Sequence, residues 1–300
     1  MIPSWVTIAL LSALFTSLRY IHIKNRCSSH SPDIVIFATR LTGAVVLLPV
    51  AVYVGGITVH EAPVFALVTT LTVLSTAFAV VIQVSLLQQE DISRSVPFLS
   101  FIPVFMIPWA MLLLNEAPGY AALAGIVFTC IGSYIIDLKA QAGLMTPIRS
   151  LFRERTSRLM LVVSMVLAFN TVCDKIAIAA SSAFSYIYCW TVASTIVMGL
   201  ICIRKNPVRT IIAGITDRHV IIQSLFWVGG YSCQMFAIRA AFGVSSGTTY
   251  VRALTLLNIL ITVIIGGSIF REKDLARKSL ATFLMVSGAV IIVLSSGVLK

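Results

Sequence analysis

Charged side chains inside long apolar segments are the residues of this chain that could do chemistry. Arg252 lies seven residues beyond Ser245, roughly 10 Å along its segment at about 1.5 Å per helical residue. Arg40 lies equally deep, counted from Asp33. A charge in hydrocarbon costs at least ~2.5 kcal/mol, so such residues usually face the protein interior or a wet cavity. An arginine there can bind a carboxylate or another anion, or it can extend outward to the lipid surface.

Polar and aromatic side chains accompany these arginines. Tyr250 and Asn258 share the segment of Arg252. Further candidate ligand-binding residues lie within or near the other apolar segments: Gln83, Asn170, Gln234, Tyr231 and Trp190. As a set they suit a cavity that hydrogen-bonds and stacks on a small amphiphile. Taken singly, each could instead be a hydrogen bond between helices, worth about 0.6 kcal/mol.

Two acidic residues are candidates to carry a coupling proton. Asp174 lies near the end of one apolar segment, and Glu90 at the end of another. A carboxylate can take up and release a proton as burial and nearby cations change. The alternative is an ion pair at a helix end for each of them. Asp174 and Lys175 are adjacent, so they point about 100° apart on a helix and each needs another partner.

Motifs of catalysis and metal binding are absent from the sequence. It has no HExxH, glycine-rich phosphate loop or GxSxG, and its six cysteines show no metal-ligand spacing. We therefore expect no catalytic residue, no metal and no cofactor, and the protein is not expected to be an enzyme. The net charge of +11 is not gathered on any polar domain, which argues against a nucleic-acid partner.

The elements that position these residues are apolar helices. Hydrophobic residues make up 58% of the 300, charged residues 11%, and the mean hydropathy is +0.99. A soluble core with a polar shell is excluded by this composition. Runs long enough to span a bilayer at about 20 residues each begin near Ile2, Asp33, Pro63, Ser95, Gly119, Leu159, Phe184, Val220, Ser245 and Lys278. We predict an all-α integral membrane protein with ten transmembrane helices, the first retained as a span.

A constant offset relates the two halves. The pairs Glu116 and Glu272, and Gly132 and Gly288, are both separated by 156 residues, since 272 − 116 equals 288 − 132. The predicted organisation is a five-span repeat over 1–137, a basic cytoplasmic linker over 138–157 and a second five-span repeat over 158–300. An odd number of spans per repeat makes the repeats inverted. Glu116 and Glu272 occupy equivalent turns, where we expect each to cap the following helix.

Basic residues predict the orientation. Seventeen of them, Arg19 and Lys24 among them, lie in or beside the loops after odd-numbered spans, against only Lys175, Arg239 and Lys300 on the other side. The positive-inside rule then places the odd-numbered loops in the cytoplasm and both termini outside.

Two stretches resemble a known family. DISRSVPFLSFIPVFMIPWAMLLLNEAPGYAALAGIVFTCIGSYII and TYVRALTLLNILITVIIGGSIFREKD are similar to the ends of the two repeats in the EamA-type branch of the drug/metabolite transporter superfamily. The resemblance implies ten helices in two inverted repeats, a central cavity and alternating access. In relatives, both termini are usually cytoplasmic, the reverse of the charge count here.

The predicted function is therefore secondary transport, as an exporter, of a small polar or amphiphilic metabolite or drug in a bacterial inner membrane. Span 4 with its three prolines, and span 9, weakened by Gly266-Gly267, would rock around the cavity. Transport would be driven by an ion gradient or would be facilitated diffusion. The alternative is a flippase for a lipid-linked phosphate carrier, with Lys175 and Arg239 as a basic headgroup site. A scaffold or receptor is disfavoured because no soluble domain is present.

Overall fold

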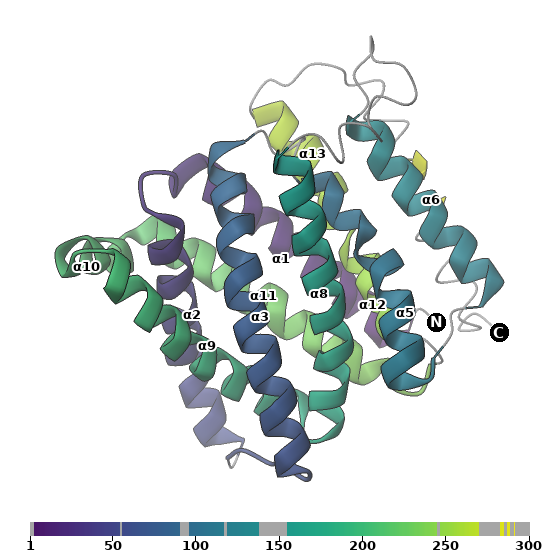
Figure 1. Ribbon diagram of the computed structural model, residues 1–300, viewed down its shortest axis with the longest axis horizontal. Coiled ribbons are helices and arrows are strands. Elements are labelled where there is room, and N and C mark those ends of the chain that lie inside the picture. Colours follow the sequence, from purple (N-terminus) through teal and green to yellow (C-terminus); the bar gives the residue numbers. More distant parts are fainter. Residues whose placement is uncertain are drawn as a thin grey trace.

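The protein is a bundle of helices of unequal length (Figure 1). The computed structural model describes residues 3–54, 56–90, 96–116, 119–137, 155–244 and 247–269, with short pieces between 283 and 291. All regular elements in these ranges are helices. Most of the predicted linker, Glu272 and almost all of the tenth predicted span lie outside the described residues.

The helices follow the predicted apolar runs. The first half contains α1 (Ser4–Arg26), α2 (Pro32–Tyr53), α3 (Ala62–Gln89), η1 (Val96–Phe101), α5 (Ile102–Leu114) and α6 (Tyr120–Asp137). The second half contains α8 (Arg155–Ala179), α9 (Ala183–Lys205), α10 (Val208–Thr216), α11 (Arg218–Ala240), α12 (Gly247–Thr255) and α13 (Asn258–Ile269). The last three residues of the predicted linker, 155–157, thus belong to α8.

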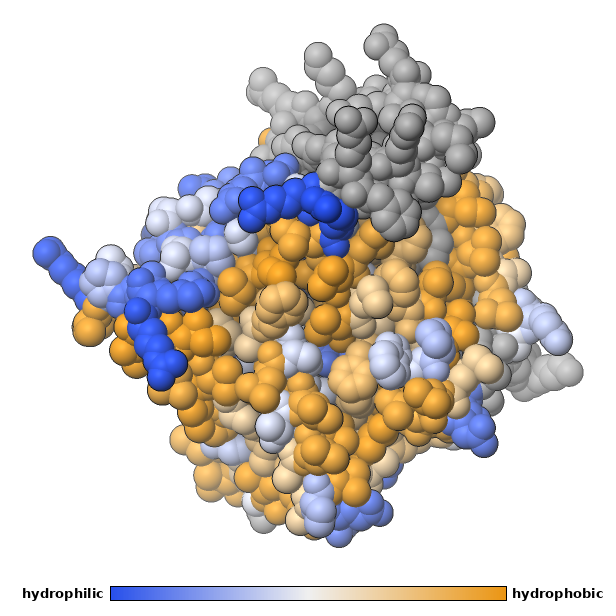
Figure 2. Space-filling model, in the orientation of Figure 1, coloured by the Kyte–Doolittle hydropathy of each residue, from blue (hydrophilic) through white to orange (hydrophobic). Residues whose placement is uncertain are grey.

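Within the described residues, seven helical segments are long and apolar enough to cross a membrane. They are α1, α2, α3, α8, α9, α11 and the segment Gly247–Gly266. Large apolar side chains point outward from them, such as Leu67 and Ile196, which are 62% and 60% exposed. Figure 2 shows hydrophobic residues over the middle of one face and hydrophilic residues toward its upper left and lower edges. This distribution suits a bundle surrounded by lipid.

Helices of the two halves interleave. The segment α1 packs along α11, α3 along α8, and α2 along α9. Furthermore, α1 contacts α12 and α13, while α8 contacts η1 and α5. Close packing of α1 on α11 depends on Gly229 and Gly230, where an added Cβ would lie 3.2 Å from Phe15 and from Thr16. Small residues let helix backbones approach in this way where lipid surrounds a bundle.

Loops after odd-numbered spans meet at one end of the bundle. His30, after α1, forms a 2.8 Å hydrogen bond with Asp217, which begins α11. Gln88, at the end of α3, donates to the carbonyl of His30 at 3.1 Å. Burial alone would raise the pKa of Asp217, but the hydrogen bonds from His30 and from the backbone N–H of His219 lower it below its ordinary value.

Loops after even-numbered spans meet at the opposite end. The backbone N–H of His60, between α2 and α3, donates to the carbonyl of Ala180 after α8 at 2.8 Å. Thr58 donates its N–H to the hydroxyl of Ser185 at 2.9 Å. The helices α1 and α8 therefore run in opposite directions, because α1 ends at the first group of loops and α8 at the second.

The short helix α10 was not predicted from the sequence. It lies in the connection between α9 and α11 and stands outside the main bundle (Figure 1). Val208 and Ile212 on it are 65% and 56% exposed. An amphipathic helix of this kind lies in a membrane interface rather than across the bilayer.

The fourth and ninth predicted spans are both interrupted. In the fourth, η1 gives way to α5 at Ile102, beside Pro103, which lacks a backbone N–H. In the ninth, α12 and α13 are separated at Leu256 and Leu257, not at Gly266-Gly267 as the sequence predicted, since α13 runs through both glycines.

Two side-chain hydrogen bonds to backbone carbonyls accompany the ninth-span break. Thr255 donates its hydroxyl to the carbonyl of Arg252 at 2.8 Å, and Ser17 of α1 donates to the carbonyl of Asn258 at 3.0 Å. At the break the backbone bonds span three residues instead of four, from the N–H of Leu257 to the carbonyl of Leu254 and from that of Ile259 to the carbonyl of Leu256. Side chains that donate to helix carbonyls favour a bend at such a place. The fourth-span break has a matching contact, because Ser164 of α8 donates to the carbonyl of Phe98 at 2.9 Å.

Candidate functional site

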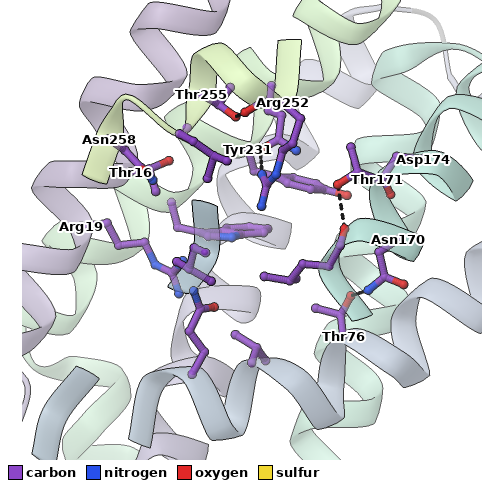
Figure 3. A pocket seen from close by; sticks show the side chains of 18 of the residues that line it. Thr16, Arg19, Thr76, Asn170, Thr171, Asp174, Tyr231, Arg252, Thr255 and Asn258 are labelled. Atoms are coloured by element: carbon purple, nitrogen blue, oxygen red, sulfur yellow. Dashed lines mark hydrogen bonds between the residues drawn. The ribbon is translucent and has the colours of Figure 1, made fainter. Parts of the chain in front are cut away.

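A polar cavity of about 120 Å³ lies inside the bundle (Figure 3). Its wall is built from α1, α2, α3, α8, α9, α11 and α12, with single residues from η1 and α13. Both halves of the chain therefore contribute to one site. A volume of this size accommodates a small metabolite or several water molecules rather than a large ligand.

Most of the sequence-predicted site residues come together around this cavity. Those that line it are Arg40, Gln83, Asn170, Asp174, Trp190, Tyr231, Gln234, Arg252 and Asn258. Tyr250 does not line it: it lies two positions from Arg252, about 200° around the helix, and is buried in an apolar cluster. Glu90 does not line it either. Its backbone carbonyl accepts from Lys24 and its carboxylate from Thr156 at 3.3 Å, at the end of α3.

Arg252 extends from α12 into the cavity, as Figure 3 shows. Its Nη1 donates to the side-chain oxygen of Gln234 at 3.0 Å. Its Nε is buried without a hydrogen-bond partner among the described residues. A guanidinium with an unused donor in a cavity wall can form charge-assisted hydrogen bonds with an anionic ligand.

Arg40 lies against an aromatic wall. Its guanidinium carbon is 4.1 Å from the ring centroid of Trp227 and 4.8 Å from that of Trp190. Tyr231 continues the wall, stacked on Trp227 at 5.0 Å. Arg40 is only 2% exposed, and its Nε and Nη1 have no partner among the described residues. Cation–π contacts thus hold the guanidinium in place while its edge stays available for a ligand.

Asp174 is a carboxylate in the cavity wall. It is 6% exposed and accepts a 2.5 Å hydrogen bond from the hydroxyl of Tyr186. Tyr186 in turn lies 3.3 Å from the hydroxyl of Thr72. Asp174 and Arg252 attract each other electrostatically. The carboxylate is therefore placed where its charge responds to whatever binds Arg252.

Arg19 is a site residue that the sequence analysis missed, because it was counted only among the basic residues in or beside the loops after odd-numbered spans. It is 8% exposed and lines the cavity, with its Nε unpartnered among the described residues. The reason is that α1 continues to Arg26, two turns beyond Arg19. The helical spacing of Ser12, Thr16, Arg19 and Tyr20 was the available signal, because it marks one polar face on an apolar helix.

Comparisons with known proteins agree with this architecture. A family model described as the EamA-like transporter family matches residues 3–137. These residues belong to the EamA-like transporter family. The matched range ends at Asp137, where the first repeat was predicted to end. No curated protein matches the chain.

Solved structures resemble the fold of this chain. One, described only as "Crystal structure of protein", matches with a TM-score of 0.67 at 12% sequence identity, covering 99% of this chain and 100% of that one. At this identity the likeness concerns the fold alone. With its seven span-length apolar helices and the family match over residues 3–137, the protein is a multi-pass membrane protein.

Two amide side chains both face the cavity and join helices. Asn170 of α8 donates to Thr76 at 2.8 Å and accepts from Ser75 at 2.7 Å, both on α3. Gln83 of α3 donates to the hydroxyl of Tyr20 on α1 at 2.9 Å. The two alternative interpretations of these amides are thus compatible, since each residue bonds a neighbouring helix and borders the cavity.

Lys175 has a partner separate from that of Asp174, as their adjacency predicted. Its ammonium pairs with the carboxylate of Glu116 after α5, and its nitrogen also lies 5.7 Å from the ring centroid of Phe242. The side chains of Lys175 and Glu116 are only 12% and 20% exposed. Glu116 thus ties α8 to the turn after α5, a role that the sequence analysis did not anticipate.

Glu116→Gln is expected to destabilise the protein. It leaves Lys175 half-buried without its counter-charge, which costs about 1–3 kcal/mol. The thermal midpoint of the purified protein in detergent should fall, while the transport rate per folded molecule changes little. Glu61→Gln, on an exposed residue at the same end, is the matched control. An unchanged midpoint combined with lost transport would show that the pair gates the cavity instead.

Metal ligands do not gather in the described ranges: no group of three or more His, Cys, Asp or Glu side chains there could hold an ion. The cysteines that the structure describes are free thiols. The arginines, the carboxylate and the aromatic rings that line the cavity can bind a charged ligand reversibly.

Proposed function

We propose that the protein is a secondary transporter that exports a small polar or amphiphilic metabolite or drug by alternating access. The observation that carries this proposal is the buried arginine, carboxylate and aromatic set around one cavity in an otherwise apolar bundle. Ionisable residues within a membrane bundle mark substrate and ion pathways. Arg252, Arg40 and the aromatic wall bind the substrate.

The proposed architecture is ten helices in two inverted repeats, 1–137 and 158–300, joined by a basic cytoplasmic linker over 138–157. The opposite directions of α1 and α8 support it, as does the reciprocal packing of α1 on α11 and of α3 on α8. The family match over residues 3–137 coincides with one repeat. Inverted repeats provide two related conformations that open on opposite faces.

The interrupted fourth and ninth spans are the proposed hinges. In each, a serine from the first helix of the other repeat donates to a carbonyl at the break, Ser164 to Phe98 and Ser17 to Asn258. A broken helix can change its bend at low cost, because its regular ladder of hydrogen bonds is already interrupted. Arg252 lies one turn before the ninth-span break, so hinge movement changes its position in the cavity.

Asp174 is the proposed coupling site, with Glu90 as the second candidate. Asp174 borders the cavity and attracts Arg252, so an anion bound to Arg252 favours protonation of this carboxylate. Glu90, at the end of α3, lies away from the cavity lining. We place the protein in a bacterial inner membrane with both termini outside, as the distribution of basic residues predicts.

The flippase alternative is less well supported. Its basic headgroup site would need Lys175, but this ammonium is paired with Glu116. A cavity of about 120 Å³ also suits a small molecule better than a lipid-linked headgroup. We therefore retain the metabolite transporter as the proposal.

Alternating access is tested by labelling a cavity residue from each side. Asn258→Cys, in a variant whose six native cysteines are replaced, is treated with a membrane-impermeant thiol reagent in vesicles of known orientation. We expect labelling from both faces, because the cavity opens to each in turn. Val45→Cys, on a lipid-facing residue that is 61% exposed, is the control and should not react. Labelling from one face only would contradict alternating access.

The substrate is sought in parallel by a toxicity and metabolite screen of a deletion strain and an overexpressing strain. Opposite changes in resistance or accumulation identify the compound class. Equal behaviour of the two strains across the screen would count against export.

A further inference from the structure

The charges that line the cavity do not balance. Three guanidinium groups face it, those of Arg19, Arg40 and Arg252, against the single carboxylate of Asp174. This leaves an excess of two positive charges on the described lining residues, since 3 − 1 equals 2. Buried charges are usually paired, because removing them from water is costly without a counter-charge.

Asp174 serves only one of the three arginines. It attracts Arg252 and accepts the hydrogen bond from Tyr186. No acidic side chain of the described residues pairs with Arg19 or Arg40. These two guanidinium groups line the same cavity, so one ligand bound there can contact both, and their like charges repel each other.

Both unpaired arginines are prepared to receive an anion. The Nε and Nη1 of Arg40 and the Nε of Arg19 are buried N–H groups that have no acceptor among the described residues. The faces of Trp190 and Trp227 fix the guanidinium of Arg40. The guanidinium carbon of Arg19 lies 5.8 Å from the ring centroid of Tyr20. In Figure 3 the side chains of Arg19 and Arg252 reach toward the cavity from different helices.

We infer that the substrate of the proposed transporter is a small organic dianion whose negative charges pair with Arg19 and Arg40. This inference rests on the proposed function and names its substrate class. A planar, bidentate oxyanion such as carboxylate or phosphate matches the edge of a fixed guanidinium. The cavity volume of about 120 Å³ restricts the ligand to a short chain. The dianion is either a dicarboxylate or a phosphate monoester, which share this chemistry.

Binding is measured on the purified full-length protein in detergent through its tryptophan fluorescence, because Trp190 and Trp227 border the cavity. Succinate, monomethyl succinate and succinamide form one series with two, one and no charges. Glutarate with its monomethyl ester, and glycerol phosphate with its methyl ester, extend the comparison. We expect at least one dianion to bind about 10-fold or more tightly than its monoanionic partner, since one further charged contact is removed in the monoanion.

Substitution of the unpaired arginines should remove this preference. Arg19→Gln and Arg40→Gln are each expected to weaken dianion binding about 10-fold or more while changing the monoanion less. Arg40→Lys keeps the charge and should retain the preference in part, which separates loss of charge from loss of packing. Arg209→Gln, on an exposed residue of α10, is the matched control.

The thermal midpoint gives a second readout that does not depend on fluorescence. Without ligand, Arg19→Gln should raise the midpoint by about 2–4 °C, because it relieves repulsion between unpaired buried charges. Dianions should stabilise the natural protein more than this variant. A merely structural Arg19 would give the opposite result, a lower midpoint without ligand.

The inference is overturned if no dianion in the panel binds more tightly than its monoanionic partner. This result leaves alternating access untouched, because labelling of Asn258→Cys from both faces does not depend on ligand charge. Conversely, tight dianion binding combined with labelling of Asn258→Cys from one face only would support the dianion-binding site and contradict transport by alternating access.

Discussion

Arg252→Gln is expected to lower transport of the identified substrate at least ~100-fold, equivalent to about 2.7 kcal/mol of lost stabilisation. The reason is its position: Arg252 is on the short helix α12, reaches into the cavity and is held there by Gln234. Glutamine is a polar side chain of comparable length, but it lacks the positive charge and the paired N–H donors of the guanidinium. Initial rates of substrate counterflow in proteoliposomes measure the effect.

Two further variants show whether charge or geometry matters at Arg252. Arg252→Lys should retain part of the activity, because the ammonium keeps the charge but cannot form two parallel hydrogen bonds with one oxyanion. Arg239→Gln is the matched control: this arginine is exposed and stacks on Phe242 at 4.8 Å, away from the cavity. Full transport by both Arg252 variants would exclude the residue from substrate binding.

The depth of a charge within an apolar segment was the sequence feature that located the cavity. Arg252, Arg40 and Asp174 were selected because a charge within lipid is costly, and all three border the site. The apolar runs likewise predicted the helices, since a span needs a nearly continuous apolar stretch. Both inferences rest on the free energy of transfer into hydrocarbon, which depends on residue type and needs no tertiary contact.

Arg19 shows where that reasoning fails. Its depth depends on where α1 ends, and an apolar run bounded by Leu18 gives no indication that the helix continues to Arg26. Helix ends are poorly encoded here because Arg26 is followed by Cys27, with neither proline nor glycine at the end. A residue at the edge of an apolar run can therefore lie inside the bundle.

Contacts between distant segments were also beyond the sequence. The break in the ninth span lies where the hydroxyl of Ser17 on α1 donates a hydrogen bond to the carbonyl of Asn258, 241 positions away. Gly266 and Gly267 looked like the weaker point, but glycine is well tolerated in a membrane helix whose neighbours pack against it. The pairing of Lys175 with Glu116 similarly depends on how α8 lies against α5.

Asp174→Asn is expected to abolish substrate accumulation driven by a pH gradient while leaving energy-independent exchange. Asparagine has nearly the same shape as aspartate and can still accept the hydrogen bond from Tyr186, so the bundle should stay folded. It cannot take up a proton, and it no longer attracts Arg252. The coupling step is thereby lost without loss of the binding site.

The measurement compares two assays on the same proteoliposomes. Uptake against a concentration gradient under an imposed pH difference should fall to the level of protein-free vesicles in Asp174→Asn, whereas counterflow at equal pH should remain measurable. Tyr186→Phe removes the hydrogen bond but keeps the carboxylate, so it should retain accumulation. If Asp174→Asn accumulates substrate as well as the natural protein does, Asp174 is not the coupling group. Glu90→Gln then becomes the variant to compare, because Glu90 is the other acidic candidate and accepts a hydrogen bond from Thr156 outside the cavity.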